Sequence, residues 1–161
     1  MYYMIEAENA ENMPKMDINF EEIRAIANEL HAKYPNYSSC ASYNDIQRIG
    51  KDAYYQDKWK YERDYAKATK PLYEARRAHG QAILNEVGTP MMGKTKAVLV
   101  AECARMMKRN GIKEAYVQNY VFSEGRTWWK SQSWFVYEEN GEYFFKMGRK
   151  VKTAHRIEGV A

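Results

Sequence analysis

The dipeptide Asn140-Gly141 constrains the fold of this chain more than any other short feature of its sequence. A two-residue type I′ turn requires positive φ at both central residues, which Asn and Gly tolerate. Residues that favour β-strands precede and follow the pair. The sequence therefore predicts a β-hairpin in which residues 127–139 pair with residues 142–147.

The turn also predicts the register of the hairpin, because directly opposed residues share one face of a sheet. Glu138 is expected opposite Tyr143, and Val136 opposite Phe145. One face then carries an apolar set, Trp134, Val136, Tyr143, Phe145 and Met147. The other face carries Phe135, Tyr137, Phe144 and Lys146. A sheet with aromatic side chains on both faces must be covered by other parts of the chain on both faces, or must bind a partner on one of them.

Apolar residues at helical spacing predict about four helices before this hairpin. Asn19 is expected to cap the first of them. A second cap at Ser42 begins a long, tyrosine-rich helix, which kinks or restarts at Pro71 and continues to about Val87. The last helix is expected over residues 95–110, with Gly111 closing its C-terminus.

From residue 112 the apolar period changes from helical to two, which indicates strands. Strands are expected over residues 115–122, in the hairpin and over residues 151–155, with a tight connection over residues 123–126. The predicted fold is therefore α+β, with N-terminal helices followed by a C-terminal antiparallel β-meander of three to four strands.

The chain length favours a single domain over residues 1–161. Residues 1–16 are expected to form an acidic N-terminal extension or an edge strand. The helical part is expected over residues 17–110, and the β-meander over residues 112–157.

The net charge of +4 conceals an asymmetry, because residues 1–22 carry −5 and the remainder carries +9. A basic body favours anionic partners such as nucleic acid or an acidic protein surface. No apolar run is long enough for a membrane helix, so no membrane partner is expected. Cys40 and Cys103 are far apart and lack metal-binding spacing. These features predict a cytoplasmic protein with reduced thiols.

The long helix carries a row of cations, Lys60, Arg63, Lys67 and Lys70. They lie within about a quarter of the helix circumference. Such a row suits contact with successive phosphates. The alternative is a solvated face with internal ion pairs, such as Lys60 with Asp64.

Basic and aromatic residues also interleave in the predicted sheet, at Trp128, Lys130, Phe135, Tyr137, Phe144, Lys146, Arg149 and Lys150. Aromatic platforms beside positive charge are what single-stranded nucleic acid binding uses. The same aromatic side chains could instead form core, or dock a partner protein.

Residues Gly88–Thr95 fit the phosphate-binding pattern G-x-x-x-x-G-K-[ST], in which Gly93, Lys94 and Thr95 would meet the phosphate. However, no Asp follows Asp64, so no downstream Asp can help to hold a magnesium ion. The segment before Gly88 also reads as a helix rather than a buried strand. A chance connection between helices is therefore favoured, although a weaker anion site at the helix N-terminus stays open.

Catalytic patterns are sparse in this sequence. His31, His79 and His155 fall on three different elements, without metal-ligand spacing. The sequence therefore predicts no catalytic residue, metal or cofactor.

The leading hypothesis is a small, basic, non-enzymatic protein, monomeric or homodimeric, that binds DNA, RNA or a nucleoprotein complex. One alternative is a protein-binding inhibitor or adaptor of the kind found among phage and mobile-element accessory proteins, including those that block host defence. The other is a phosphate- or nucleotide-binding protein that uses Gly88–Thr95.

Overall fold

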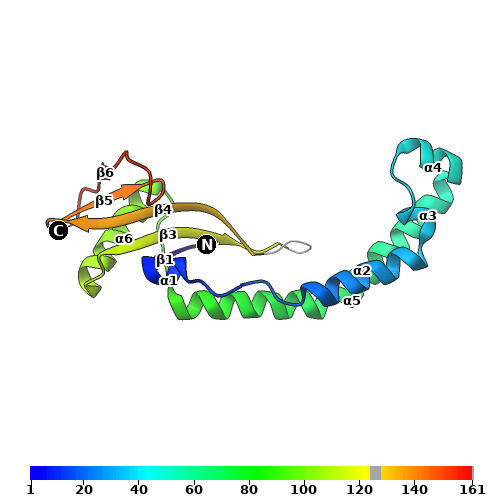
Figure 1. Cartoon of the computed structure of the whole chain (residues 1–161), viewed down its shortest axis with the longest axis horizontal. Helices are drawn as coiled ribbons and strands as arrows, with labels where there is room; N and C mark the ends of the chain where they lie inside the picture. The colour runs from blue at the N-terminus through cyan, green and yellow to red at the C-terminus, as the bar shows by residue number, and fades with distance from the viewer. Residues whose placement is uncertain (124–127, 161) are drawn as a thin grey trace. The chain divides into compact units, whose positions relative to one another are not determined.

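A computed structural model of the chain describes residues 1–123 and 128–160 (Figure 1). It contains both helices and an antiparallel sheet, as predicted. The chain divides into two compact units, Met1–Met16 with Arg77–Ala161, and Asp17–Arg76. The boundary between Arg76 and Arg77 falls inside the longest helix.

The first unit holds a sheet of six described strands, with the order β2-β1-β3-β4-β5-β6 and antiparallel pairing throughout. The strands are β1 (Tyr2–Glu6), β2 (Gly88–Pro90), β3 (Glu114–Val121), β4 (Trp129–Glu139), β5 (Glu142–Lys146) and β6 (His155–Arg156). The expected meander is its centre, formed by β3, β4 and β5. The layout of helices followed by a meander of three to four strands needs correction, because β1 and β2 extend this sheet from earlier in the chain. β1 is paired on both sides, so it is an inner strand and β2 is the edge.

The hairpin turn and most of its register are confirmed. Asn140 and Gly141 have φ values of 53° and 80°. The paired residues run from Glu139 opposite Glu142 to Phe135 opposite Lys146. β5 ends there, so Met147 is exposed and does not join the apolar face.

The last strand is shorter and later than the expected 151–155, because the chain first turns back after β5. In that turn the backbone N–H of Val151 donates to the carbonyl of Gly148. Residues 124–127 lie outside the described residues, so the expected connection over 123–126 and the expected first strand residue, Thr127, are not described.

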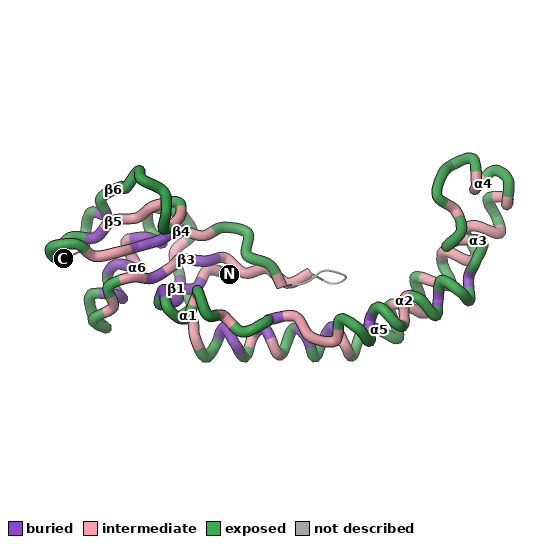
Figure 2. Tube along the Cα trace, in the orientation of Figure 1, coloured by how far each residue is buried: buried purple, intermediate pink, exposed green. Residues whose placement is uncertain are grey.

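One face of the sheet is covered by α6 (Lys96–Asn110), as buried residues in Figure 2 indicate. Leu99, Cys103 and Met107 are fully buried against this face, together with Val117 and Val136 of the sheet. The hydroxyl of Thr95 caps the helix by accepting from the N–H of Val98, at 3.4 Å. Gly111, with φ of 68°, ends it. Both ends therefore lie where the sequence predicts them.

The opposite face of β1 packs against the C-terminal part of α5 (Lys51–Val87). Tyr3 and Ile5 form a second core there with Ile83 and Leu84. Beyond β1 the chain forms the short helix α1 (Ala7–Glu11), where a loop or extension was expected. Both faces of the sheet therefore contribute to a core.

The second unit contains α2 (Phe20–Lys33), α3 (Pro35–Ser38), α4 (Tyr43–Ile49) and the N-terminal part of α5. Asn19 adopts a left-handed conformation, and its side chain donates to the carbonyl of Leu72 at 3.2 Å. It therefore does not cap α2 through its side chain, contrary to expectation.

The expected cap at Ser42 is confirmed, because its hydroxyl accepts from the N–H of Asp45 at 3.4 Å. It begins α4, not the long helix. Gly50, with φ of 102°, separates α4 from α5. α5 is a single helix of 37 residues that contains Pro71. Of the two outcomes expected at this proline, a kink or a restart, the restart does not occur.

An ion pair beside the hairpin turn should make the stability of the protein depend on pH. Lys113 Nζ lies 2.9 Å from Glu138 Oε2, and the N–H of Gly141 donates to Glu138 Oε1 at 2.7 Å. These two donors lower the pKa of Glu138 from its ordinary value of 4.5, and the Lys113 bond contributes most. Because the folded pKa is depressed, the stabilisation is present above pH 4.5 and is lost as the pH falls through the folded pKa.

We therefore expect Glu138→Gln to reduce the loss of stability on acidification. Thermal melting temperatures between pH 3 and pH 7 would measure this for the parent protein and the variant. Glu139→Gln is the matched control, since Glu139 is exposed and faces Glu142 across the hairpin. Parallel pH profiles for the parent protein and Glu138→Gln would contradict the prediction.

Candidate nucleic-acid interface

The aromatic row that the sequence predicts on the second hairpin face is present. Phe135 and Tyr137 have ring centroids 5.7 Å apart, and Tyr137 and Phe144 have centroids 5.5 Å apart. Tyr116 of β3 extends the row, with its ring 5.2 Å from that of Phe135. However, Phe135 is only 4% exposed, and Tyr137 and Phe144 are half-buried. Phe135 is therefore a core residue.

Cations of the same unit lie over these rings. The guanidinium of Arg149 is 5.4 Å from the ring centroid of Phe135, and Lys146 Nζ is 5.1 Å from that of Tyr137. Arg149 also bonds to the carboxylates of Glu11 and Glu114, the latter at 2.6 Å. The ring faces on which a base would stack thus carry intramolecular cations, and two carboxylates offset the charge of Arg149. This surface is less suited to nucleic acid than the sequence suggests.

The other predicted sheet residues do not extend this row. Trp128 packs closely against α5, where a Cβ added at Gly80 would lie 2.2 Å from its Nε1 atom. Its ring is also 5.4 Å from that of Phe122. Lys130 and Lys150 are exposed.

The G-x-x-x-x-G-K-[ST] segment already holds an anion of its own chain. The carboxylate of Glu102 accepts from the N–H groups of Met92 and Gly93, at 3.1 Å and 3.0 Å. The hydroxyl of Thr95 caps α6, and Lys94 is exposed. A phosphate at Gly93, Lys94 and Thr95 would have to displace Glu102 from these backbone donors. This geometry favours a structural connection between β2 and α6.

The cationic row on α5 lies in the second unit and is exposed at all four positions, Lys60, Arg63, Lys67 and Lys70. Arg63 Nε lies 3.3 Å from Asp64, and Lys70 Nζ lies 4.0 Å from Glu74. Asp64 also accepts from the hydroxyl of Tyr34, which lowers the pKa of Asp64 more than any other contact does. Asp64 thus makes its contacts with Tyr34, Lys33 and Arg63 rather than forming the expected pair with Lys60.

Two aromatic side chains that the sequence did not single out lie on the same side of α5. Trp59 is 64% exposed and Tyr55 is 41% exposed. Tyr55, Trp59, Arg63 and Lys67 are spaced four residues apart, which places them in one stripe along the helix. With Lys60 and Lys70 they occupy about 140° of the helix circumference. We call these six residues the α5 face.

The α5 face belongs to a unit that is neutral as a whole, and two of its cations, Arg63 and Lys70, lie near the carboxylates of Asp64 and Glu74. Residues 17–76 carry ten Asp and Glu and ten Lys and Arg, so the unit has no net charge to attract an anion. Four of its aspartates make contacts within the unit, Asp17, Asp45, Asp57 and Asp64. Any attraction for an anion must therefore come from the local arrangement of the cations.

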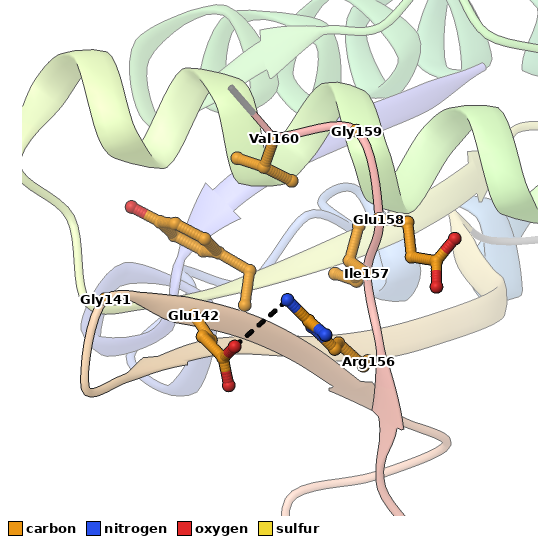
Figure 3. A pocket seen from close by; sticks show the side chains of 8 residues that line it. Gly141, Glu142, Arg156, Ile157, Glu158, Gly159 and Val160 are labelled. Atoms are coloured by element: carbon orange, nitrogen blue, oxygen red, sulfur yellow. Dashed lines mark ion pairs between the residues drawn. The ribbon is translucent and has the colours of Figure 1, made fainter.

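A pocket of about 410 Å³ lies between the hairpin turn and the C-terminal segment (Figure 3). Glu142 and Arg156 form an ion pair of 3.0 Å in its wall. The N–H of Ile157 donates to the carbonyl of Tyr143 at 2.8 Å, which holds the segment in place. The dashed line in Figure 3 joins Glu142 and Arg156, so these two charged side chains are already paired with each other.

The described residues bring together no group of three His, Cys, Asp or Glu that could hold a metal ion. The three histidines make separate contacts: His31 stacks on Tyr61, His155 stacks on Phe145, and a ring nitrogen of His79 lies 3.0 Å from the Lys15 carbonyl. Burial raises the pKa of the Cys103 thiol to about 12. This thiol therefore stays protonated at neutral pH and is a poor nucleophile.

Comparisons of the chain with protein-family models, curated proteins and solved structures found no match. No helix within the described ranges is both long and apolar enough to cross a membrane. Of the two surfaces that combine aromatic and basic side chains, the sheet row around Phe135 and the α5 face, the α5 face is the more accessible.

Proposed function

We propose that this protein binds nucleic acid through the α5 face. The observation that carries the proposal is the exposure of four cations beside an exposed tryptophan on one side of a long helix. Lys and Arg side chains that meet phosphates release condensed counterions, and this release drives binding. A rigid helix presents them in a fixed row.

The dimensions of the row suit a nucleic acid strand. Lys60 and Lys70 are ten residues apart, which corresponds to about 15 Å along a helix. Measured along the axis of B-form DNA, this length covers about four phosphate intervals of one strand. Four contacts would give a slope of log affinity against log salt of about −3 to −4.

The proposal predicts that Lys60→Glu with Lys67→Glu weakens binding and flattens its salt dependence. Fluorescence anisotropy of labelled DNA and RNA oligomers at several salt concentrations would measure both quantities. Because two of the four cations are lost, the slope should change by about 1.5 to 2. Affinity should fall for every sequence tested, since phosphate contacts do not read bases.

A matched control is Lys130→Glu with Lys150→Glu. Both lysines are exposed and lie in the sheet region, and the double substitution changes the net charge equally. Retained binding in this control with loss in the α5 variant would support the α5 face. Equal losses would indicate a general charge effect and contradict the proposal, as would indifference to the α5 substitutions. If no oligomer binds, and a protein partner binds in a salt-insensitive way, the adaptor alternative takes its place.

A further inference from the structure

We infer that Trp59 and Tyr55 form a stacking site for an unpaired base, so that the ligand of the α5 face is single-stranded nucleic acid. The inference rests on the proposed function and adds the class of ligand. Its experiment separates failure of the stacking site from failure of the cationic row.

The two rings form an open site on one side of the helix. Their centroids are 6.0 Å apart, and their planes are inclined by 34°. A pocket of about 240 Å³ is lined by these rings together with Asp52 and Gln56. All four residues come from about two consecutive turns of α5, so the helix itself holds their spacing.

Trp59 offers the more accessible ring of the two. Lys58 Nζ lies 5.8 Å from the ring centroid of Tyr55, so a cation already lies over the ring of that tyrosine. Trp59 is the more exposed, at 64% against 41% for Tyr55. A tryptophan also presents the largest aromatic surface of any side chain, and aromatic rings stack on every base. We therefore assign the stacking contact mainly to Trp59.

The polar side chains beside the rings orient a bound strand. Gln56 has both donors and an acceptor, as the edge of a base does, whereas the Asp52 carboxylate accepts only. The same carboxylate repels phosphate, while Arg63 and Lys67, one and two turns beyond Trp59, attract it. A strand would therefore place a base against Trp59 and its backbone along Arg63 and Lys67.

This arrangement favours a single strand over a duplex. In a duplex both faces of each internal base are already stacked, and extruding a base costs a few kcal/mol. A single strand offers unstacked bases without that cost. A duplex could still contact the four cations, but it would leave Trp59 without a base.

The test compares a labelled single strand with its duplex by anisotropy, for the parent protein, Trp59→Ala and Trp59→Phe. The parent should prefer the single strand. Trp59→Ala should weaken single-strand binding about 5- to 150-fold, which corresponds to about 1 to 3 kcal/mol for one stacked base. Trp59→Phe should retain most of the affinity, and duplex binding should change little in either variant.

Trp129→Ala is the control, because Trp129 is also exposed, at 45%, but lies in β4 of the other unit. It should bind the single strand as the parent does. Tryptophan fluorescence gives a second readout. An oligomer should quench the fluorescence of the parent protein, and it should quench that of Trp59→Phe much less. Circular dichroism checks that each variant is folded.

Each outcome bears on one of the two claims. Equal affinity for single strand and duplex, with no effect of Trp59→Ala, would overturn the stacking site but leave the cationic row standing. The absence of salt-dependent binding to either ligand would remove the proposed function itself. Single-strand binding lost equally in Trp59→Ala and Trp129→Ala would overturn the assignment to α5.

Discussion

Replacement of Trp134 by alanine is expected to lower the free energy of unfolding by about 3 to 5 kcal/mol, the range for large aromatic residues removed from a core. Trp134 is 6% exposed and belongs to the cluster that α6 covers. Its ring stacks on that of Tyr2, with centroids 5.7 Å apart and an interplanar angle of 10°. The substitution would leave a cavity beside β1, which holds the sheet together between β2 and β3.

The matched control for this prediction is Trp129→Ala in the same strand. Trp129 is 45% exposed, so its truncation should cost much less than that of Trp134. Urea denaturation followed by circular dichroism would give both free energies. Hydrogen exchange of the β3 and β4 amides would show whether the sheet itself is destabilised. Similar losses for the two substitutions would mean that Trp134 does not occupy the core between α6 and the sheet.

The parts of the fold that sequence reasoning predicted correctly depend on local rules. Asn140 and Gly141 allow positive φ, and that turn determines the register of the hairpin. The hydroxyl of Thr95 and the left-handed Gly111 define the two ends of α6 in the same way. In each case the residues that decide the structure are within a few positions of one another.

The sheet order could not be predicted because strand pairing depends on distant segments. Gly88-Thr89-Pro90 has the composition of a helix terminator, and it does follow α5. It also pairs with β1, whose residues are more than 80 positions earlier in the chain. A three-residue strand has no periodicity to detect, and an edge position tolerates its proline.

Whether the sheet aromatics form a free platform or part of the core could not be decided from the sequence, for a similar reason. Alternation along the hairpin correctly places Phe135, Tyr137 and Phe144 on one face. It cannot show that Arg149 folds over Phe135 or that Glu11, 138 residues away, pairs with that arginine. Burial on the second face of a sheet is decided by such long-range contacts.

The exposed aromatic pair on α5 was not predicted, although its spacing along the helix is visible in the sequence. Tyr55 and Trp59 precede Arg63 and Lys67 at intervals of four residues. Apolar periodicity directs attention to the tyrosines of the buried side, such as Tyr65, whose hydroxyl lies 2.9 Å from that of Tyr73. An exposed aromatic stripe violates the usual partition of apolar side chains, and such violations are where binding sites are found.

A last prediction concerns the contact between Gly80 and Trp128, where two effects of one substitution oppose each other. Gly80→Ala should stabilise a helix interior by about 1 kcal/mol. Here the added Cβ would lie 2.2 Å from Trp128 Nε1 and 2.6 Å from its Cδ1, so the indole must move. Overpacking of this kind costs about 1 to 3 kcal/mol. We therefore expect Gly80→Ala to be neutral or to destabilise the protein by up to about 2 kcal/mol.

A double-mutant cycle with Trp128→Ala separates the two effects, because removal of the indole removes the clash. In that background Gly80→Ala should become stabilising by about 1 kcal/mol. Urea denaturation of the four proteins gives the coupling energy, expected to be about 1 to 3 kcal/mol. Ala82→Gly, two residues along the same helix, is the control for helix propensity and should cost about 1 kcal/mol in either background. If Gly80→Ala stabilises the parent as much as it stabilises the Trp128→Ala variant, the indole does not pack on Gly80. A change of sign between the two backgrounds would instead show that glycine is required there for the close approach of Trp128 to α5.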